Sequence, residues 1–594
     1  MTAAATVQLT RVLIANRGEI ALRIVRACRD AALTSVTVYA DPDAGAPFVR
    51  LADEAVALGG ATPAQTYLDA AKLLAAAERA GADAVHPGYG FLAENADFAQ
   101  AVLDAGLIWI GPPPDVIRAL GDKVRARAIA AQAGVPLVPG TERPVGAGDA
   151  VAFARQHGLP IAIKAAHGGG GRGLRIARTL DDVEAQFAAA VREATSAFGR
   201  GECFVESYVE RGRHVEAQVL ADVHGNVSVV GTRDCTLQRR YQKLVEEAPA
   251  PFLSEMQRAD LERHAAAICR AAGYVNAATV EFLLAPAGEL SFLEVNTRLQ
   301  VEHSATEESV DVDIVRAQLR IAAGHPLDLA VTSAGQDRGR HAIEFRINAE
   351  DPANEFAPST GMITGLRLPG GPGVRLDSGI EAGTVVGGQF DSLLAKLIVT
   401  GRDRSQATER ARRAIDEFEI TGVRTTLPFF AALLRDPAFI SDGSDGFTVH
   451  TRWIEEDYLP TADPAEAPDS SLAVRIGSRW LAVNLPALEN PESTRLVSVR
   501  EQVRDRVQRA EKDAGDIISA PMQATVTKVE VADGDDVSEG QVVAVVEAMK
   551  MENQLRAPHA GQVSELRVSS GDTLAQGDSV CRITPHTGGR CASG

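Results

Sequence analysis

The stretch NAATVEFLLAPAGELSFLEVNTRLQVEH, residues 276–303, holds two alternating apolar segments on either side of the turn letters PAG. Alternation with a period of two is typical of β-strands, and turn residues between two such runs indicate a hairpin. A hairpin centred on this turn sets Glu281 opposite Glu294 and places Asn296 on the same face. The sequence therefore predicts two carboxylates that face each other across neighbouring strands.

The two facing glutamates need a neutralising partner, because like charges directly opposed across a sheet destabilise it. A hard cation such as Mg²⁺ binds carboxylate oxygens by preference. Glu281, Glu294 and Asn296 therefore form a candidate metal site. Two solvated glutamates on the protein surface are the alternative.

The loop that follows the hairpin, RLQVEH, brings charged and polar residues into a short segment. They are Arg298, Gln300, Glu302 and His303. A guanidinium beside a carboxylate can orient a small anion and remove a proton from it. We therefore expect a small-anion site next to the candidate metal site.

An earlier stretch, PIAIKAAHGGGGRGLRIAR at residues 160–178, is rich in glycine, and Gly168, Gly170 and Gly173 satisfy the spacing GxGxxG. The dinucleotide-binding fingerprint requires a helix after the glycines. The letters LRIA that follow are strand-like instead, which disfavours a Rossmann fold. A glycine-rich hairpin can still lay backbone N–H groups over phosphates, and Lys164 would add a positive charge. A flexible surface hairpin is the alternative.

The segments on both sides of these motifs differ in their patterns. Alternating strand-like and helix-like units from RVLIA onward are typical of an open α/β domain and reach about residue 122. Short strands with one helical stretch occupy residues 343–452. Residues 453–515 are rich in proline and charge, and we interpret them as a mostly solvated connector that contains a strand or two.

The C-terminal part contains an internal repeat, because APMQATV from Ala520 matches APHAGQV from Ala557, 37 residues further on. Two copies of one strand unit predict a quasi-two-fold β sandwich. Lys550 lies between Met549 and Met551 near the crossing from one copy to the other, which predicts an exposed turn. A buried strand whose lysine reaches the surface is the alternative.

The overall composition excludes several classes of protein. The 594 residues carry 45% hydrophobic side chains and a formal net charge of −19 at pH 7. This balance is ordinary for a globular protein and lacks the basic surface of a nucleic-acid-binding domain. No run of about 18 apolar residues occurs, so we expect no membrane span. The six cysteines are scattered without a CxxC pair, which is typical of reduced thiols in a cytoplasmic protein.

These motifs together resemble a known family. EAMKMEN looks like the biotin-attachment motif of biotinyl domains, with Lys550 as the lysine to be biotinylated. Seven further motifs resemble biotin carboxylase, an ATP-grasp enzyme, over residues 8–452: IANRGEIALRI, HPGYGFLAEN, IKAAHGGGGRG, RDCTLQRR, EEAPA, FLEVNTRLQVEH and EFRINAEDP. The chain is therefore similar to the α subunit of a biotin-dependent acyl-CoA carboxylase of the actinobacterial acetyl- or propionyl-CoA type, a ligase of fatty acid biosynthesis.

The resemblance implies a multidomain protein of the α/β and α+β classes. An ATP-grasp biotin carboxylase would consist of an open α/β N-terminal domain, an ATP-grasp domain and a strand-rich C-terminal domain, and an all-β biotinyl sandwich would follow it. The implied boundaries are an N-terminal domain at 8–122, an ATP-grasp domain with a glycine-rich lid at 123–335, a C-terminal domain at 343–452, a connector at 453–515, a biotinyl carrier domain at 516–586 and a disordered tail at 587–594.

The resemblance also implies roles for individual residues. ATP would be held by Lys123, Lys164, Gly170, Gly171, Glu206, Tyr208, Val209, His214, Glu281 and Glu294. Mg²⁺ or Mn²⁺ would be bound by Glu281, Glu294 and Asn296. Bicarbonate would be held by Lys243, Arg298, Gln300 and Val301. Glu302 would deprotonate bicarbonate, and Arg346 would bind biotin and stabilise the enolate of its ureido ring. The implied catalytic residues are Glu302, Arg298, Arg346 and Lys243.

The implied cofactors are ATP, Mg²⁺ or Mn²⁺, and biotin that is covalently attached to Lys550. The implied partners are a biotin protein ligase, the substrate bicarbonate and a separate carboxyltransferase β subunit in a hetero-oligomer, with no nucleic acid and no membrane. The carboxyltransferase would select the acyl-CoA.

Two positions depart from the family pattern. Tyr241 stands where the family commonly has histidine, and Ser207 replaces a frequent lysine beside the adenine contacts. We expect an altered affinity for ATP. One alternative is a carrier whose ATP-grasp half is silent, and the intact Glu302, Arg298 and Lys164 argue against it. Another is an ATP-grasp ligase for a different substrate with a lipoyl-like tail, although the letters AMKM are typical of biotinyl domains.

Overall fold

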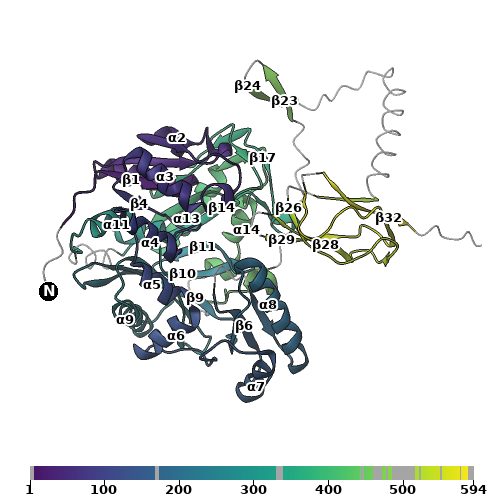
Figure 1. Cartoon of the computed structure of the whole chain (residues 1–594), viewed down its shortest axis with the longest axis horizontal. Helices are drawn as coiled ribbons and strands as arrows, with labels where there is room; N and C mark the ends of the chain where they lie inside the picture. The colour runs from purple at the N-terminus through teal and green to yellow at the C-terminus, as the bar shows by residue number, and fades with distance from the viewer. Residues whose placement is uncertain are drawn as a thin grey trace, which may run out of the picture.

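The structure is a computed structural model of the whole chain (Figure 1). It describes residues 6–167, 173–328, 339–441, 443, 447–458, 471–476, 479–484, 516–520, 524–548, 551–574 and 577–585. Gly170, Gly171 and Lys550, which the sequence singles out, lie outside the described residues. The predicted tail and most of the predicted connector lie outside them as well.

The N-terminal part forms a five-stranded parallel sheet in the order β3-β2-β1-β4-β5. Its strands are nearly continuous apolar runs, as expected for strands covered on both faces. Val12 and Ile14 pack with α1, whereas Leu13 packs with α3 and α4 on the other face. The strands are β1 (Arg11–Ile14), β2 (Thr34–Tyr39), β3 (Glu54–Ala57), β4 (Ala84–His86) and β5 (Ile108–Trp109). The helices are α1 (Gly18–Asp30), α2 (Pro47–Leu51), α3 (Ala70–Ala80), α4 (Ala96–Asp104) and α5 (Pro114–Gly121).

The glycine-rich stretch joins two antiparallel strands, as the letters LRIA predict. Ile161 pairs with Ala177, and Lys164 pairs with Leu174. No helix follows the glycines directly, which excludes the Rossmann arrangement at this point. The small sheet has the order β7-β6-β8. Its elements and covering helices are α7 (Ala147–His157), β6 (Ile161–Ala165), β7 (Leu174–Ala177), α8 (Val183–Phe198) and β8 (Cys203–Ser207).

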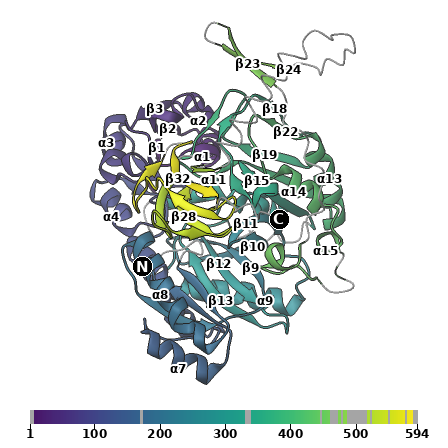
Figure 2. The same ribbon diagram turned by 90° about the vertical axis from the view of Figure 1, so that its right-hand side faces the viewer.

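The largest sheet has eight strands in the order β13-β12-β9-β10-β11-β14-β21-β19, and all neighbours are antiparallel. It continues from the predicted ATP-grasp segment into the predicted C-terminal segment, because β11 pairs with β14. Figure 2 shows β12, β9, β10 and β11 of this sheet next to one another. The strands are β9 (Arg213–Ala221), β10 (Val227–Arg239), β11 (Gln242–Ala248), β12 (Asn276–Leu284), β13 (Leu290–Asn296), β14 (His341–Asn348), β19 (Val374–Ser378) and β21 (Leu393–Gly401).

Helices and short ladders surround this sheet. The helices are α6 (Lys123–Gln132), α9 (Glu255–Ala271), α10 (His303–Val310), α11 (Ile314–Ala322), α13 (Arg404–Glu417), α14 (Leu427–Leu433), α15 (Pro437–Ile440) and α16 (Trp453–Glu456). The ladders pair β15 (Glu350–Asp351) with β16 (Ala357–Pro358), β17 (Gly361–Met362) with β20 (Val385–Val386), and β18 (Gly365–Arg367) with β22 (Glu419–Thr421).

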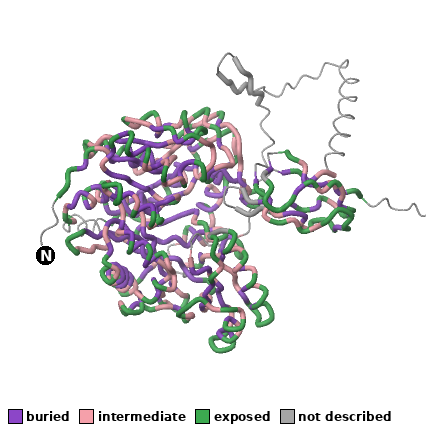
Figure 3. The backbone as a smooth tube through the Cα atoms, viewed as in Figure 1, coloured by how far each residue is buried: buried purple, intermediate pink, exposed green. Residues whose placement is uncertain are grey.

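The large sheet brings glutamates together on neighbouring strands. Glu281 of β12 pairs with Glu294 of β13, which confirms the predicted hairpin register. On its other side Glu281 pairs with Glu216 of β9. Since β9 is buried along its whole length (Figure 3), Glu216 lies in the interior of the protein.

The C-terminal part is a sandwich of two four-stranded sheets, in the orders β25-β32-β30-β27 and β29-β28-β26-β31. Its internal repeat is visible in the backbone, because the equivalent Gly534 and Gly571 have φ angles of 94° and 99°, which glycine adopts without strain. The strands are β25 (Ile517–Ser519), β26 (Ala524–Val529), β27 (Asp536–Val537), β28 (Val542–Ala548), β29 (Met551–Arg556), β30 (Gly561–Ser564), β31 (Thr573–Leu574) and β32 (Ser579–Pro585).

The beginning of the predicted connector is part of the folded body. Trp453 and Ile454 of α16 are buried in the core beneath β14 and α14. Further along, β23 (Ser471–Ile476) and β24 (Arg479–Asn484) form an antiparallel hairpin. Among the helices that the structure describes, none is both long and apolar enough to cross a bilayer.

Candidate active site

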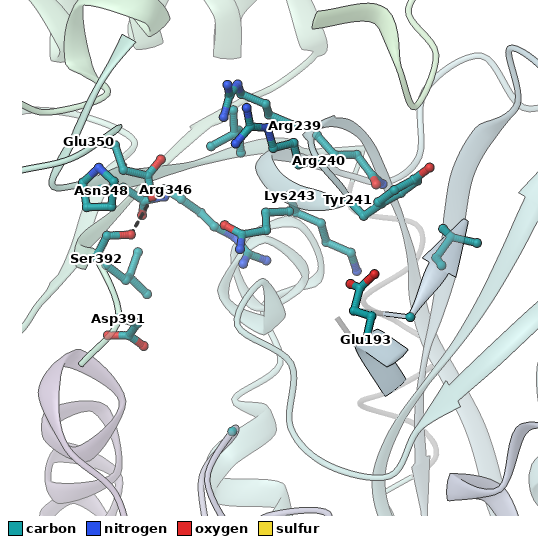
Figure 4. A pocket seen from close by; sticks show the side chains of 18 of the residues that line it. Glu193, Arg239, Arg240, Tyr241, Lys243, Arg346, Asn348, Glu350, Asp391 and Ser392 are labelled. Carbon is teal, nitrogen blue, oxygen red and sulfur yellow. Dashed lines mark hydrogen bonds between the residues drawn. The ribbon is translucent and has the colours of Figure 1, made fainter. Parts of the chain in front are cut away.

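A cavity of about 2310 Å³ is lined by residues from distant parts of the chain (Figure 4). Tyr89 and Glu94 come from the N-terminal segment, Lys243 from β11 and Arg346 from β14. Lys528 of β26 lines the cavity as well. The carrier segment therefore borders the same space as the predicted carboxylase residues.

Lys243 lines the cavity and contacts three buried carboxylates. Its Nζ lies 2.7 Å from Glu216 Oε2, 3.1 Å from Glu281 Oε1 and 2.6 Å from Glu302 Oε1. Burial opposes the ammonium charge, but Cys235 and these carboxylates hold the pKa of Lys243 well above its usual range. The lysine is therefore a permanent cation in a mostly anionic wall.

Glu302 is fully buried and lies between two cations. Its Oε1 accepts a hydrogen bond from Lys243 Nζ, and its Oε2 accepts one from Arg346 Nη2 at 2.8 Å. Burial alone would raise the carboxyl pKa, but Lys243 and Arg346 outweigh it and hold the pKa of Glu302 well below its usual range. Glu302 is therefore ionised at neutral pH.

Arg346 joins Glu302 to a second buried carboxylate. Its Nε donates to Glu246 Oε1 at 2.6 Å, while its Nη2 reaches Glu302. Glu246 is fully buried and pairs across the sheet with Glu344 of β14. The guanidinium is thus fixed from two sides while Arg346 lines the cavity (Figure 4).

The predicted metal ligands lie close together and offer oxygen donors. Asn296 Nδ2 donates to Glu281 Oε1 at 2.8 Å, and Glu294 Oε2 lies 3.3 Å from Lys123 Nζ. Among the described residues, a second group of possible ligands consists of His214, Glu216 and Glu281, whose ligand atoms lie within 4.8 Å of one another. Carboxylate and amide oxygens are the donor set that Mg²⁺ prefers, so the predicted residues fit this ion.

Five of the predicted nucleotide residues line the cavity, namely Lys123, Lys164, His214, Glu281 and Glu294. Lys164 forms an ion pair with Glu206, and Arg127 Nη1 donates to the other oxygen of that glutamate at 2.9 Å. His214 lies 3.0 Å from Glu281 through Nε2, and its Nδ1 is 3.0 Å from Gln238 Nε2. Glu206 and Ser207 are the last two residues of β8, and Tyr208 and Val209 follow directly after them.

The predicted bicarbonate residues lie beside Lys243. Arg298 donates through Nε to Glu94 at 2.9 Å and through Nη1 to Gln300 Oε1 at 3.1 Å. Gln300 Nε2 in turn lies 3.3 Å from Glu281 Oε1. Val301 has its carbonyl bonded to Lys396 Nζ at 2.6 Å. The predicted set therefore comes together in space.

Comparison with known proteins identifies the family. Family models match residues 8–117 (biotin carboxylase, N-terminal domain), 122–330 (carbamoyl-phosphate synthase L chain, ATP binding domain), 344–456 (biotin carboxylase C-terminal domain) and 515–583 (biotin-requiring enzyme). A biotin-dependent acyl-coenzyme A carboxylase alpha3 subunit of Mycobacterium leprae is 55% identical over 601 residues, which cover 98% of this chain and 100% of that protein.

The chain belongs to the biotin-dependent acyl-CoA carboxylase α subunits. It is therefore an ATP-dependent biotin carboxylase with a biotin carrier domain, and its cofactors are biotin, ATP and Mg²⁺. Membership of this family also implies a carboxyltransferase partner.

Other relatives match the carboxylase part of this α subunit. Biotin carboxylase of Haemophilus influenzae is 47% identical over 74% of this chain and 97% of its own length. The biotin carboxylase domain of Hydrogenobacter thermophilus 2-oxoglutarate carboxylase, solved with MgADP, ADP and bicarbonate, has a TM-score of 0.72 and 42% identity and covers 76% of this chain and 100% of that chain. These matches confirm the predicted fold class.

Several buried charged residues that lie next to the site of this α subunit were missed in the sequence. Glu216 and Arg233 are fully buried, and Arg233 Nε donates to Glu216 Oε1 at 2.6 Å. Glu246 and Lys396 are buried as well. The signal available in the sequence was a charged residue inside an apolar strand, as in HVEAQV around Glu216, but its partners lie on strands whose pairing the sequence does not reveal.

Proposed function

We propose that Glu302 is the base that deprotonates bicarbonate in this α subunit. The observation that supports this most strongly is a buried, ionised carboxylate that is bonded to both Lys243 and Arg346, two residues that line the cavity. A carboxylate with such a low pKa is a weak base on its own. An arriving bicarbonate anion competes for Lys243 and Arg298, and this competition raises the proton affinity of Glu302.

The proton of the bicarbonate O–H passes to Glu302, and a bicarbonate oxygen then attacks the γ-phosphorus of ATP. The O–P bond to ADP breaks, and carboxyphosphate forms. Lys123 and Lys164 hold the phosphates as point charges. Glu281, Glu294 and Asn296 would hold Mg²⁺, which would neutralise phosphate charge. Positioning and charge stabilisation account for this type of catalysis.

Biotin attached to Lys550 would supply the ureido nitrogen N1 that accepts the carboxyl group of carboxyphosphate, and the N1 proton would leave with the released phosphate. Arg346 would stabilise the negative charge of the ureido ring. The lysine and biotin arm reaches only a little more than about 10 Å, so the carrier has to approach the cavity as a unit. The position of Lys528 beside the cavity supports this approach.

We propose further that a biotin protein ligase modifies Lys550, and that the α subunit acts in a hetero-oligomer with its carboxyltransferase β subunit. That partner would select acetyl-CoA or propionyl-CoA. The described cysteines are free and buried, which is in keeping with a cytoplasmic location.

The test uses the purified chain, biotinylated by a ligase and incubated with ATP, Mg²⁺ and radiolabelled bicarbonate. Protein-bound, acid-labile label that requires ATP is the expected result. Confirmed biotin on Lys550 without any label would instead favour the silent carrier. The mass of the adduct on Lys550 separates a biotinyl carrier from a lipoyl-like one.

A further inference from the structure

The turn between β10 and β11 has a strained backbone. Arg239 pairs with Gln242, so Arg240 and Tyr241 alone form the loop of this hairpin. Their φ angles are 48° and 64°, and both residues therefore occupy the left-handed region. Two-residue hairpin loops of this kind ordinarily use Asn-Gly or Asp-Gly. A strained conformation of larger residues persists only where surrounding contacts determine it, and such places are often functional.

The contacts that hold this turn come from α16 and the residue before it, at the start of the predicted connector. Glu455 of α16 accepts a hydrogen bond from the backbone N–H of Arg240 at 2.6 Å. Burial raises the pKa of the Tyr241 phenol, and Arg452, which directly precedes α16, lies close enough to oppose that rise. The Nε of Arg452 donates to Glu456 at 2.6 Å. The backbone of the turn is thus bonded to α16, and the phenol of Tyr241 lies beside the guanidinium of Arg452.

That segment is itself firmly anchored. Trp453 and Ile454 are buried in the core, and Asp457 lies 3.0 Å from His450 Nε2 and 2.8 Å from Arg211 Nη2. The segment can therefore act as a fixed support for the turn.

The turn in question belongs to the nucleotide end of the active site. Tyr241 lines the large cavity (Figure 4). Gln238, three residues before it, contacts His214 and pairs across the hairpin with Lys243. Arg452 lines a second cavity of about 390 Å³ with Arg178, Tyr208, Glu210, Arg211 and Glu456. Tyr241 and Arg452 therefore form part of the wall between the two cavities.

We propose that Arg452 and Glu455 are positioning residues for ATP, because they hold Tyr241 against the base and ribose side of the nucleotide. This inference rests on the proposed nucleotide site. It also gives Tyr241 a role that Arg452 supports, so the change from histidine to tyrosine need not lower the affinity for ATP. Because α16 lies at the start of the predicted connector, the segment that leads toward the carrier begins beside the proposed ATP site.

The test measures ATP-dependent carboxylation of free biotin by the full chain, with ATP and bicarbonate titrated separately. Tyr241→Phe removes only the hydroxyl, and Arg452→Leu removes its partner. We expect each variant to raise KM for ATP about three- to tenfold, the effect of one lost polar contact. We expect kcat and KM for bicarbonate to stay within about twofold of the parent values. Glu210→Gln is the matched control, because Glu210 lines the same second cavity and its ion pair is with Arg178.

A rescue experiment distinguishes positioning from general damage. Glu455→Ala should raise KM for ATP, and adding Arg240→Asn should restore most of the loss, because asparagine tolerates the left-handed region. Unchanged KM for ATP in Tyr241→Phe and Arg452→Leu overturns the inference, and so does an equal increase in Glu210→Gln. Binding of MgADP to the parent chain is measured first by calorimetry. A parent chain that binds no MgADP contradicts the proposed nucleotide site itself, whereas equal binding by parent and variants contradicts only the positioning role.

Discussion

Replacing Lys243 with methionine should change the pH dependence of the reaction as well as its rate. Lys243 contacts Glu216, Glu281 and Glu302 at once. Methionine keeps much of the length of the side chain and removes its charge. Each carboxylate retains another donor after the change, which for Glu302 is Arg346, and we therefore expect the variant to fold.

The size of the effect follows from the shortest contact. Two unit charges 2.6 Å apart, as in the pair of Lys243 and Glu302, attract each other by about 6 kcal/mol at an effective dielectric constant of about 20. Removing one member of a buried ion pair typically costs about 3–5 kcal/mol. If that loss falls on the transition state, kcat/KM for bicarbonate falls about 100- to 5000-fold.

The sign of the pH effect follows from the lowered pKa of Glu302. In the parent chain burial opposes ionisation, yet Lys243 and Arg346 keep the carboxyl ionised, so the base should stay available over the whole range of a neutral assay. Without Lys243 the pKa of Glu302 rises, and the base becomes protonated as the pH falls. We therefore expect kcat/KM of the variant to decline toward acidic pH more steeply than that of the parent.

The assay is carboxylation of free biotin, with kcat/KM for bicarbonate measured across neutral pH. Lys123→Met is the matched control, because Lys123 lies 3.3 Å from Glu294 and its ion pair does not involve Glu302. The control should lose affinity for ATP and keep the parent's pH profile. A Lys243→Met variant with the parent's profile, or a control with the same shift, would refute the assignment of Glu302 as the base.

The remaining predictions concern attachment, catalysis and stability. Lys550→Ala should abolish biotinylation, read by streptavidin blot, and leave carboxylation of free biotin intact; loss of both activities would contradict the modular arrangement. Glu302→Gln should remove carboxylation while Lys550 remains biotinylated, and an active variant would exclude Glu302 as the base. Arg404→Leu should destabilise the fold by about 3 kcal/mol or more, seen as a lower Tm, because Arg404 donates to the buried Glu247 at 2.7 and 2.9 Å. Burial would raise the pKa of Glu247, but Arg404 and His341 lower it from 4.5 to about 2. Its contribution to Tm should therefore be complete above pH 4.5 and be lost as the pH falls toward 2. The Arg404→Leu variant keeps the contact with His341 and should show a weaker form of this dependence.

The local sequence pattern was sufficient to predict the hairpin of β12 and β13, but it did not predict which strands lie beside that hairpin. The register of Glu281 with Glu294 follows from a period of two and a short turn, and both are visible in the sequence. The pairing of Glu281 with Glu216 joins strands that are far apart in the chain, and no turn between them sets a register that could be predicted. Arg233 was missed for the same reason, since its importance depends on the strand beside it.

The same limit applies to the two ends of the site. The glycine-rich strands were predicted because both lie next to the glycines, and the structure pairs them as expected. The support of Tyr241 by α16 joins a turn to a segment more than two hundred residues later, as the bond between Arg240 and Glu455 shows. The sequence pattern of neither segment predicts that contact.

The electrostatics of the cavity explain why its catalytic part should tolerate the departures at Tyr241 and Ser207. The carboxylates on neighbouring strands would repel one another, so each needs its own cation, and Lys243, Arg233 and Arg346 supply them from inside the fold. These contacts are independent of the nucleotide, and they hold the base and its partners in place before any substrate binds. Substitutions at the nucleotide end should therefore change how tightly ATP is held, and they should leave the proton acceptor and its charge unchanged.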